Sequence, residues 1–289
     1  MSVFGGDLLA ALASRLRAAP PPVAVLAGSG TSSLSGIITG EDLLLRIAAD
    51  RGEQPGHDPV GWYIRTFGVF PNYIRMLQQA GGTGDELALP CSYFESAPGR
   101  PVTPSPAHRA IAAMAAAGLV GPILTPNFDR LLEQALREAG VRFRAAYNLR
   151  AMTRALGAGC GTAEGGLLLV KLHGDYKDIS IRDTSGGFAT YHPVIDALLK
   201  AVLSQFDLLV CGWSASWDIP LRQAMQRWAD PARRRTFWLL RGTATPEAAQ
   251  VIAARQAHVI PVTSSSAGLT ALARHLRLPA GGPPGEPAC

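Results

Sequence analysis

Cysteine is scarce in this chain of 289 residues, which contains four. They are Cys91, Cys160, Cys211 and Cys289, and no two of them form a Cys-x-x-Cys pair. Zinc knuckles and disulfide frameworks both require paired cysteines at characteristic spacings. We therefore expect neither a structural metal nor a disulfide scaffold.

Long apolar runs are also missing. The longest, residues 110–124, is shorter than a bilayer-spanning helix and contains Gly118, Gly121 and Pro122. The N-terminal residues lack the apolar core and the cleavage site of a secretion signal. The sequence therefore predicts a soluble, cytoplasmic protein.

Charged residues make up 17% of the chain against 47% hydrophobic residues, and the net charge is +5. This composition is ordinary for a globular α/β protein and excludes a disordered chain. Acidic residues are interspersed with the basic run Arg233-Arg234-Arg235, and no aromatic stacking platform is evident. The pattern favours a solvated surface over direct binding of nucleic acid.

Apolar strands alternate with amphipathic helices along most of the chain. Strands are predicted at residues 23–27, 120–125, 142–146, 167–172, 208–212, 236–240 and 258–262. Helices are predicted at residues 8–16, 41–49, 106–117, 130–139, near Met152, and at 194–204, 219–229, 246–255 and 267–276. Almost wholly apolar strands separated by such helices predict an α/β fold with a Rossmann-like, doubly wound parallel sheet.

One domain is expected over residues 1–278, with a mostly helical inserted module at about residues 53–104. Within this module two short helices separated by Pro71 are predicted at residues 62–79, and residues 80–106 have little periodicity. Residues 279–289 are rich in proline and glycine, and we expect a disordered tail or a linker there.

The residues that follow each strand matter most, because ligands of a parallel sheet bind outside the carboxyl ends of its strands. Gly28, Ser29, Gly30, Thr31 and Ser32 follow the first predicted strand. Glycines let the backbone approach a phosphate, and amides and hydroxyls donate hydrogen bonds to it. A dehydrogenase fingerprint would have a third glycine at the next position, where this chain has serine, so an ordinary tight turn remains the alternative.

Asn127 and His173 follow two other predicted strands. The amide of Asn127 comes just before a predicted helix and can face the ligand-binding edge, whereas Asp129 is also explained as a helix N-cap. His173 stands beside Gly174 at the end of a buried strand, a position that suits proton transfer. A histidine with a purely structural role is the alternative.

The fourth segment runs from Gly212 to Asp218 and follows another predicted strand. Its small residues, Ser214 among them, form a turn that could hold an adenosine ribose. Asp218 is either a ribose ligand or the N-cap of the next helix.

The order and spacing of these four segments resemble the motifs of the sirtuin family. Residues 28–37, G-S-G-T-S-S-L-S-G-I, are similar to the family's phosphate and ribose loop, G-A-G-x-S-x-x-S-G-I. Residues 125–129, T-P-N-F-D, occupy the place of its T-Q-N-x-D motif, and residues 171–174, K-L-H-G, that of its catalytic x-x-H-G. The resemblance spans about residues 23–276.

A closer resemblance is to the sirtuin-like domains of bacterial anti-phage proteins. Typical forms there are T-x-N-F-D-R-L-L-E, K-L-H-G-D-Y and G-W-S-A-x-W-D-x-x-L-R, which residues 125–133, 171–176 and 212–222 match. Such domains, among them the effectors of Thoeris systems and those joined to short prokaryotic Argonautes, cleave NAD⁺ when infection is sensed. The resemblance therefore implies an NAD⁺ hydrolase that breaks the nicotinamide–ribose bond in an abortive-infection response.

The resemblance also implies roles for individual residues and partners. Asn127 would orient the ribose or a water, and His173 would act as general base. NAD⁺ would be the substrate without any metal, in a homo-oligomer with a separate or fused sensor or Argonaute-like partner, so that nucleic acid is contacted only indirectly. The residues implied to contact NAD⁺ are Gly28, Ser29, Gly30, Thr31, Ser32, Ser35, Gly36, Thr125, Asp129, Gly212, Ser214 and Asp218.

Two functions of other classes stay open. NAD⁺-dependent protein deacylases carry P-D-F-R after the phosphate loop and a four-cysteine zinc module, whereas this chain has Ile38-Thr39-Gly40-Glu41 and no cysteine pairs. A non-catalytic sensor of NAD⁺ or ADP-ribose would keep the phosphate loop and lose the catalytic pair, yet Asn127 and His173 are both present. Pro126 is a further departure, because it restricts Thr125 to an extended backbone.

Overall fold

The structure is a computed structural model, and it describes residues 3–18, 22–69, 71, 73, 76, 96–97, 100–161, 166–177, 190–216 and 218–279. The chain divides into two compact units. The first comprises Met1–Leu34 and Thr103–Cys289, and the second comprises Ser35–Val102.

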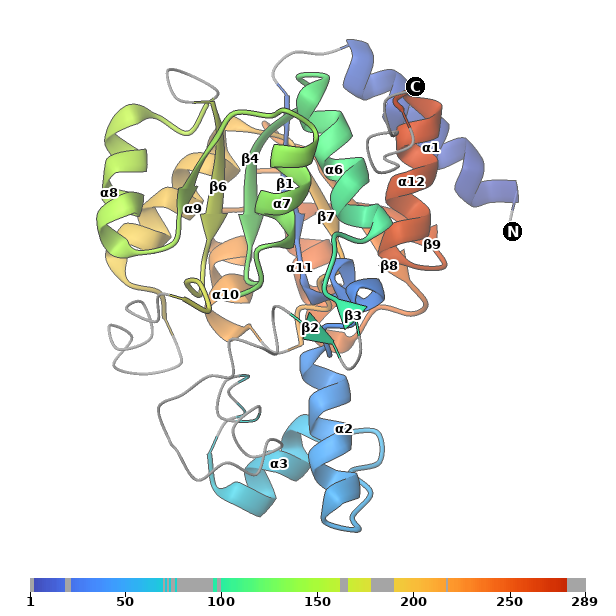
Figure 1. Cartoon of the computed structure of the whole chain (residues 1–289), viewed down its shortest axis with the longest axis vertical. Coiled ribbons are helices and arrows are strands. Elements are labelled where there is room, and N and C mark those ends of the chain that lie inside the picture. Colours follow the sequence, from blue (N-terminus) through green and yellow to red (C-terminus); the bar gives the residue numbers. More distant parts are fainter. Residues whose placement is uncertain are drawn as a thin grey trace. The chain divides into compact units, whose positions relative to one another are not determined.

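A seven-stranded parallel sheet forms the centre of the first unit, in the order β5-β6-β4-β1-β7-β8-β9 (Figure 1). Its strands are β1 (Val23–Ala27), β4 (Val120–Thr125), β5 (Phe143–Ala146), β6 (Leu167–Lys171), β7 (Leu208–Cys211), β8 (Thr236–Arg241) and β9 (His258–Val262). The bounds of β1, β4 and β9 are those predicted, and each of the other four differs by one residue. The predicted doubly wound α/β fold is therefore confirmed.

Two groups of helices cover the two faces of this sheet (Figure 1). One face packs against α1 (Val3–Ala18), α6 (Pro106–Ala116), α7 (Leu131–Glu138) and α12 (Ser265–His275). The other packs against α8 (Leu149–Ala158), α9 (Pro193–Gln205), α10 (Ile219–Arg227) and α11 (Pro246–Arg255). A strand buried on both faces needs apolar residues at every position, which is why the strands read as continuous apolar runs.

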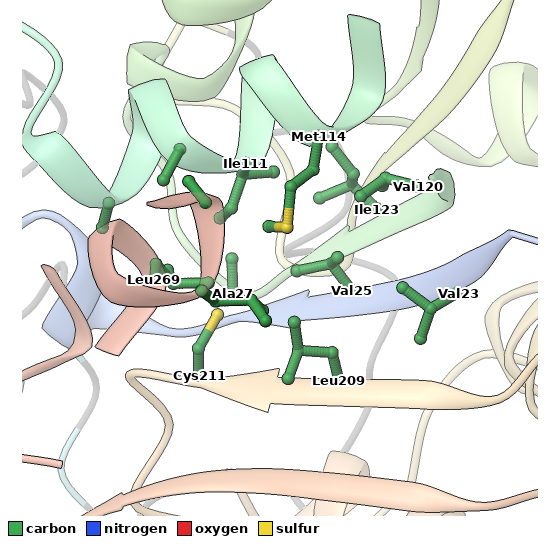
Figure 2. Packing of buried hydrophobic residues seen from close by; sticks show 14 of the residues in the cluster. Val23, Val25, Ala27, Ile111, Met114, Val120, Ile123, Leu209, Cys211 and Leu269 are labelled. Carbon is green, nitrogen blue, oxygen red and sulfur yellow. The ribbon is translucent and has the colours of Figure 1, made fainter. Parts of the chain in front are cut away.

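Strand β1 illustrates this double burial. Val25 and Ala27 belong to one hydrophobic cluster, whereas Ala24 and Leu26 belong to the other. Figure 2 shows the first cluster, in which side chains of β1 and β7 lie beneath Ile111 of α6 and near Leu269 of α12. Because side chains of a strand alternate between its faces, a single five-residue segment contributes to both cores.

Local signals explain where the helices of the first unit begin. Ser105 caps α6 by accepting the amides of Ala107 and His108, and Pro106 occupies the first turn, where no amide partner is needed. Thr245 and Pro246 start α11 in the same way. These Ser-Pro and Thr-Pro pairs are why the predicted starts agree with the observed ones.

The second unit contains α2 (Gly40–Asp50), α3 (Pro59–Phe67) and a short antiparallel pair, β2 (Ser96–Ala97) with β3 (Arg100–Pro101). Helices α2 and α3 contact each other within this unit. The unit runs from Ser35 to Val102, and the inserted module predicted at about residues 53–104 stays a prediction. The strand pair lies where little regular structure was expected. The second short helix predicted up to residue 79 and the tail after residue 279 lie almost wholly outside the described residues.

None of the helices in the described ranges combines the length and the apolar character that crossing a membrane requires.

Candidate functional site

The four polar segments predicted to form the site follow β6, β4, β1 and β7, which are neighbours in the sheet. Strands of a parallel sheet end at one edge, so the segments meet there. β1 is also the point where the chain changes direction: strands β4 to β6 extend to one side of it and β7 to β9 to the other. Such a topological switch point is the usual ligand position in this class of fold.

The segment after β1 is a 3-10 turn, Ser29–Thr31, held by bonds within the protein. The amide of Thr31 and its hydroxyl both donate to the Gly28 carbonyl, at 3.0 and 2.7 Å. The amide of Gly30 donates to the Gly212 carbonyl at 2.9 Å. These donors are therefore occupied by the protein, and Ser29 is the exposed member of the turn.

Close contact between two loops explains the glycines of this turn. A Cβ atom on Gly30 would lie 3.0 Å from the Cα atom of Gly212, and one on Gly212 would lie 2.7 Å from the Thr31 nitrogen. Gly212 also has a φ of +65°, in the left-handed region that favours glycine. Packing thus requires these glycines before any ligand is considered, and phosphate binding by the turn remains a prediction.

Asn127 is buried against the segment after β1. Its Nδ2 donates to the Gly28 carbonyl and to Ser32 Oγ, both at 3.2 Å. The backbone amide of Asn127 donates to Thr125 Oγ1, whose hydroxyl donates to the Ala27 carbonyl. Since a carbonyl can only accept, these bonds fix the amide orientation and leave Oδ1 without a hydrogen bond to any described residue.

Ser32 joins Asn127 to two further residues, Asp129 and His108. Its hydroxyl donates to Asp129 Oδ2 at 2.8 Å and lies 3.3 Å from His108 Nε2. His108 Nδ1 accepts the backbone amide of Ser105, so the ring proton is on Nε2 and points to Ser32. The Ser32 hydroxyl therefore accepts two hydrogen bonds and donates one.

His108 was not predicted from the sequence to be near the site. It is fully buried, and burial lowers its pKa to about 4, with the charge of Arg109 adding to this effect and that of Asp129 opposing it. The ring is therefore neutral at pH 7. A signal was available, because Ser105 and His108 have the three-residue spacing of a capping box with histidine in place of Glu or Gln.

Asp129 is not the N-cap of α7, which is Arg130. Its Oδ1 nevertheless accepts the amide of Leu131 at 3.1 Å, while Oδ2 accepts the Ser32 hydroxyl. Asp129 thus supports both the start of α7 and the segment after β1.

His173 follows β6 and is about one-third exposed. Its Nε2 lies 3.0 Å from Asp218 Oδ2 and 3.0 Å from the Tyr191 hydroxyl. Burial and the neighbouring Asp218 raise the pKa of Tyr191 well above 10, so the tyrosine keeps its proton. Tyr191 was not predicted from the sequence, where no motif marks the turn before α9.

Lys171 links the His173 turn to the Asn127 segment. Its buried Nζ contacts Asp175 Oδ2 at 2.7 Å, Glu133 Oε1 at 3.2 Å, and the carbonyls of Phe128 and Asp129 at 3.0 and 2.7 Å. The charged residues of the two sequence motifs thus meet at one lysine.

Asp175 also accepts Arg130 Nε, at 2.9 and 3.0 Å from its two oxygens. Burial raises the pKa of this carboxyl, but the hydrogen bonds and charges of Arg130 and Lys171 outweigh burial and hold it below its usual range. For Glu133 burial outweighs Lys171, and its pKa is raised. Asp175 is therefore the stronger anionic partner of the lysine.

The segment after β7 ends at the N-cap of α10, Asp218, whose Oδ1 accepts the amide of Leu221 at 3.0 Å. Within the segment Ala215 has a φ of +61°, and Arg222 holds its carbonyl at 3.1 Å. Ser214 is exposed. The N-cap alternative for Asp218 is confirmed, and contact of Ser214 and Gly212 with adenosine remains a prediction.

Ser35 and Gly36 of the predicted phosphate and ribose loop lie in the second compact unit. Gly36 has a φ of +86°, and Ser35 Oγ makes no hydrogen bond to any described residue. Their contact with NAD⁺ also remains a prediction.

Hydrogen bonds and one His–Asp side-chain contact join the four segments in a closed ring. Asn127 bonds to Gly28, and the carbonyl of Thr125 accepts the amide of Leu172 at 2.8 Å, next to His173. His173 contacts Asp218 in the segment after β7. In the same segment the carbonyl of Gly212 accepts the amide of Gly30. The structure therefore brings both predicted catalytic residues into one connected group at the carboxyl edge of the sheet.

Over the described residues, no three His, Cys, Asp or Glu side chains are grouped so as to hold a metal ion. Cys160 and Cys211 are free and buried, and burial raises the pKa of Cys211 to about 12. Cys91 and Cys289 lie outside the described residues.

Comparison with known proteins shows that part of this chain is similar to a known family. Residues 122–260 match the family model of the SIR2-like domain, and this range contains Asn127, His173 and Asp218. The part of the chain from residue 122 to residue 260 is thus similar to a SIR2-like, that is sirtuin-like, domain, as the resemblance predicted. Such a domain indicates NAD⁺-dependent activity in general.

A search of solved structures found a chain from work on the structural basis for the mechanism and regulation of Sir2 enzymes. It is 16% identical, with a TM-score of 0.48, and the match covers 94% of this chain and 97% of that one. A search of the curated proteins found no match.

Proposed function

We propose that this protein hydrolyses NAD⁺ at the nicotinamide–ribose bond. Water replaces nicotinamide at the anomeric carbon, and the products are ADP-ribose, nicotinamide and a proton. The observation that carries the proposal is the joining of Asn127 and His173, through buried bonds, at the strand ends of a SIR2-like domain.

The chemistry needs little acid catalysis, because nicotinamide leaves from a bond that already carries a positive charge. It needs oriented dipoles that stabilise the oxocarbenium character of the ribose, and a positioned water. Asn127 offers Oδ1 as an acceptor for that water or for a ribose hydroxyl, since its Nδ2 is held by Gly28 and Ser32. His173 accepts the proton released, directly or through the ribose hydroxyls.

Binding of NAD⁺ is assigned to the surrounding segments. Ser29, the exposed residue of its turn, is the first candidate to contact the pyrophosphate. Ser214 is likewise exposed and contacts the adenosine side. Gly28, Gly30, Thr31, Ser32, Thr125, Asp129 and Gly212 shape the site mainly through their bonds to one another.

We further propose that the protein is an abortive-infection effector of bacterial anti-phage defence. The support is the sequence K-L-H-G-D-Y and its two companion motifs. Lys171 and Asp175 of the first motif form a buried charged group with Glu133 of residues 125–133. In this role the protein assembles as a homo-oligomer, and a separate or fused sensor or Argonaute-like partner triggers it.

Release of nicotinamide, measured by chromatography over a range of protein concentrations, tests the proposed reaction. Asn127→Ala and His173→Ala should each lower turnover by two to four orders of magnitude, about the value of a positioned general base. Asn148→Ala removes the N-cap asparagine of α8, and His275→Ala removes a histidine at the end of α12. Both controls should keep near-normal turnover.

The same preparations separate the alternative functions. Turnover that requires an acetylated peptide would identify a deacylase. Binding of NAD⁺ or ADP-ribose without turnover, at every concentration and with the cognate partner present, would favour a sensor. Near-normal turnover of His173→Ala would show that the histidine has a structural role.

A further inference from the structure

His173, Tyr191 and Asp218 form a compact group from three separate segments. Nε2 of His173 lies 3.0 Å from both Asp218 Oδ2 and the Tyr191 hydroxyl. The Tyr191 hydroxyl also lies 3.3 Å from each oxygen of Asp218. Three polar groups thus bond to one another in pairs.

The proton positions follow from what each group can do. An ionised carboxylate only accepts, so Asp218 receives a hydrogen from Tyr191 and another from His173 Nε2. The Tyr191 oxygen, having donated its own hydrogen to Asp218, is an acceptor toward Nε2. His173 therefore carries its hydrogen on Nε2, and its ring is oriented by two acceptors.

Asp218 has little capacity left for a ribose. It is buried, Oδ1 accepts the amide of Leu221 at the start of α10, and Oδ2 accepts His173. A ribose ligand would need a carboxylate oxygen turned toward the substrate. The contacts of Asp218 are instead directed at the helix it caps and at His173.

We propose that Asp218, together with Tyr191, is a positioning residue for His173 and not a ligand of the adenosine ribose. The carboxylate fixes the ring orientation and its tautomer, and it stabilises the positive charge that His173 acquires when it takes a proton. The expected effect of Asp218 on turnover rests on the proposed function. The effect of Asp218 on the orientation and the pKa of His173 does not depend on turnover.

Two titratable side chains from other segments contact His173. Asp218 comes from the start of α10 and Tyr191 from the turn before α9. On its own turn Asp175 is two residues away, and its carboxylate is bound to Lys171 and Arg130. Of these two carboxylates, Asp218 is the one that contacts the ring directly.

Asp218→Asn in the full chain is the decisive variant, because asparagine also caps helices well and removes the charge without removing the cap. The pKa of His173 is measured by NMR of histidine-labelled protein, with His173→Ala assigning its signal. We expect Asp218→Asn to lower this pKa by about 1 to 3 units, the usual effect of losing an adjacent opposite charge. Tyr191→Phe should lower it less.

Affinity distinguishes a positioning role from substrate contact. A carbocyclic NAD⁺ analogue, which cannot be hydrolysed, should bind Asp218→Asn within about threefold of wild type, whereas kcat for NAD⁺ should fall about tenfold to a hundredfold. Asp58→Asn is the matched control, since Asp58 is the N-cap of α3 in the other unit. It should leave the His173 pKa unchanged.

An unchanged His173 pKa in Asp218→Asn overturns the proposal, as does a loss of analogue affinity of tenfold or more. If wild-type protein releases no nicotinamide, the proposed function fails, but the NMR and analogue measurements still decide the role of Asp218.

Discussion

Lys171 Nζ lies 2.7 Å from Asp175 Oδ2, and both side chains are fully buried. The same ammonium group holds the carbonyls of Phe128 and Asp129. The Lys171 ammonium group thus bonds both to the segment that carries Asn127 and to the turn that carries His173. We therefore expect the relative positions of the two predicted catalytic residues to depend on this lysine.

Lys171→Met should lower the free energy of unfolding by about 3 to 5 kcal/mol, because the substitution leaves buried carboxylates without their cation. Urea denaturation at pH 7.5 measures it. Arg233→Met, which removes an exposed pair with Asp230, should cost less than about 1 kcal/mol. If Lys171→Met lowered the unfolding free energy by less than about 1 kcal/mol, the lysine would not be essential for holding the Asn127 segment against the His173 turn.

Gly30→Val should destabilise the protein by about 1 to 3 kcal/mol and weaken binding of the carbocyclic NAD⁺ analogue, since the added atoms meet Gly212. Gly157→Ala is the control: it lies in α8 with open space around it, and should stabilise by about 0.5 to 1 kcal/mol. Denaturation and calorimetric binding measure both effects. Full stability in Gly30→Val would contradict the observed loop contact.

Stability should fall as the pH drops from 7 to 5, because the pKa of His108 is about 4 in the folded protein against an ordinary value of 6.5. The unfolded chain binds a proton in this range that the folded chain does not, so acid favours unfolding. The contribution of this residue is about 2 kcal/mol over that range.

His108→Gln isolates the effect, since glutamine keeps the capping geometry with Ser105 and does not titrate. Between pH 7 and 5 the unfolding free energy of wild type should fall by about 2 kcal/mol more than that of the variant. A parallel pH dependence of the two proteins would show that His108 is not the group responsible.

Exhaustive treatment with EDTA should change neither nicotinamide release nor the free energy of unfolding. The proposed chemistry uses Asn127 and His173 and requires no Lewis acid. The unfolding measurement is informative even for protein that shows no turnover. Loss of activity on chelation, restored by a divalent metal, would contradict the assignment.

Local sequence pattern was enough to predict the strands and the positions of Asn127 and His173. Strand β1 reads as V-A-V-L-A because both faces of the sheet are covered. The apolar residues that this burial requires lie within the strand itself, so the sequence of the strand is enough to predict it. The polar residues that follow such strands must reach one edge of a parallel sheet. The fold class and the two predicted catalytic residues therefore followed from periodicity and motif order.

The tertiary structure alone decided which of these segments contact one another. Asp218 meets His173 because the loops after β6 and β7 converge across the ends of β4 and β1, and no local pattern encodes that order of strands. His108 reaches Ser32 from a helix far along the chain, and Gly30 is confined by Gly212. Side-chain periodicity reports burial within one element, whereas contacts between loops depend on how distant elements pack.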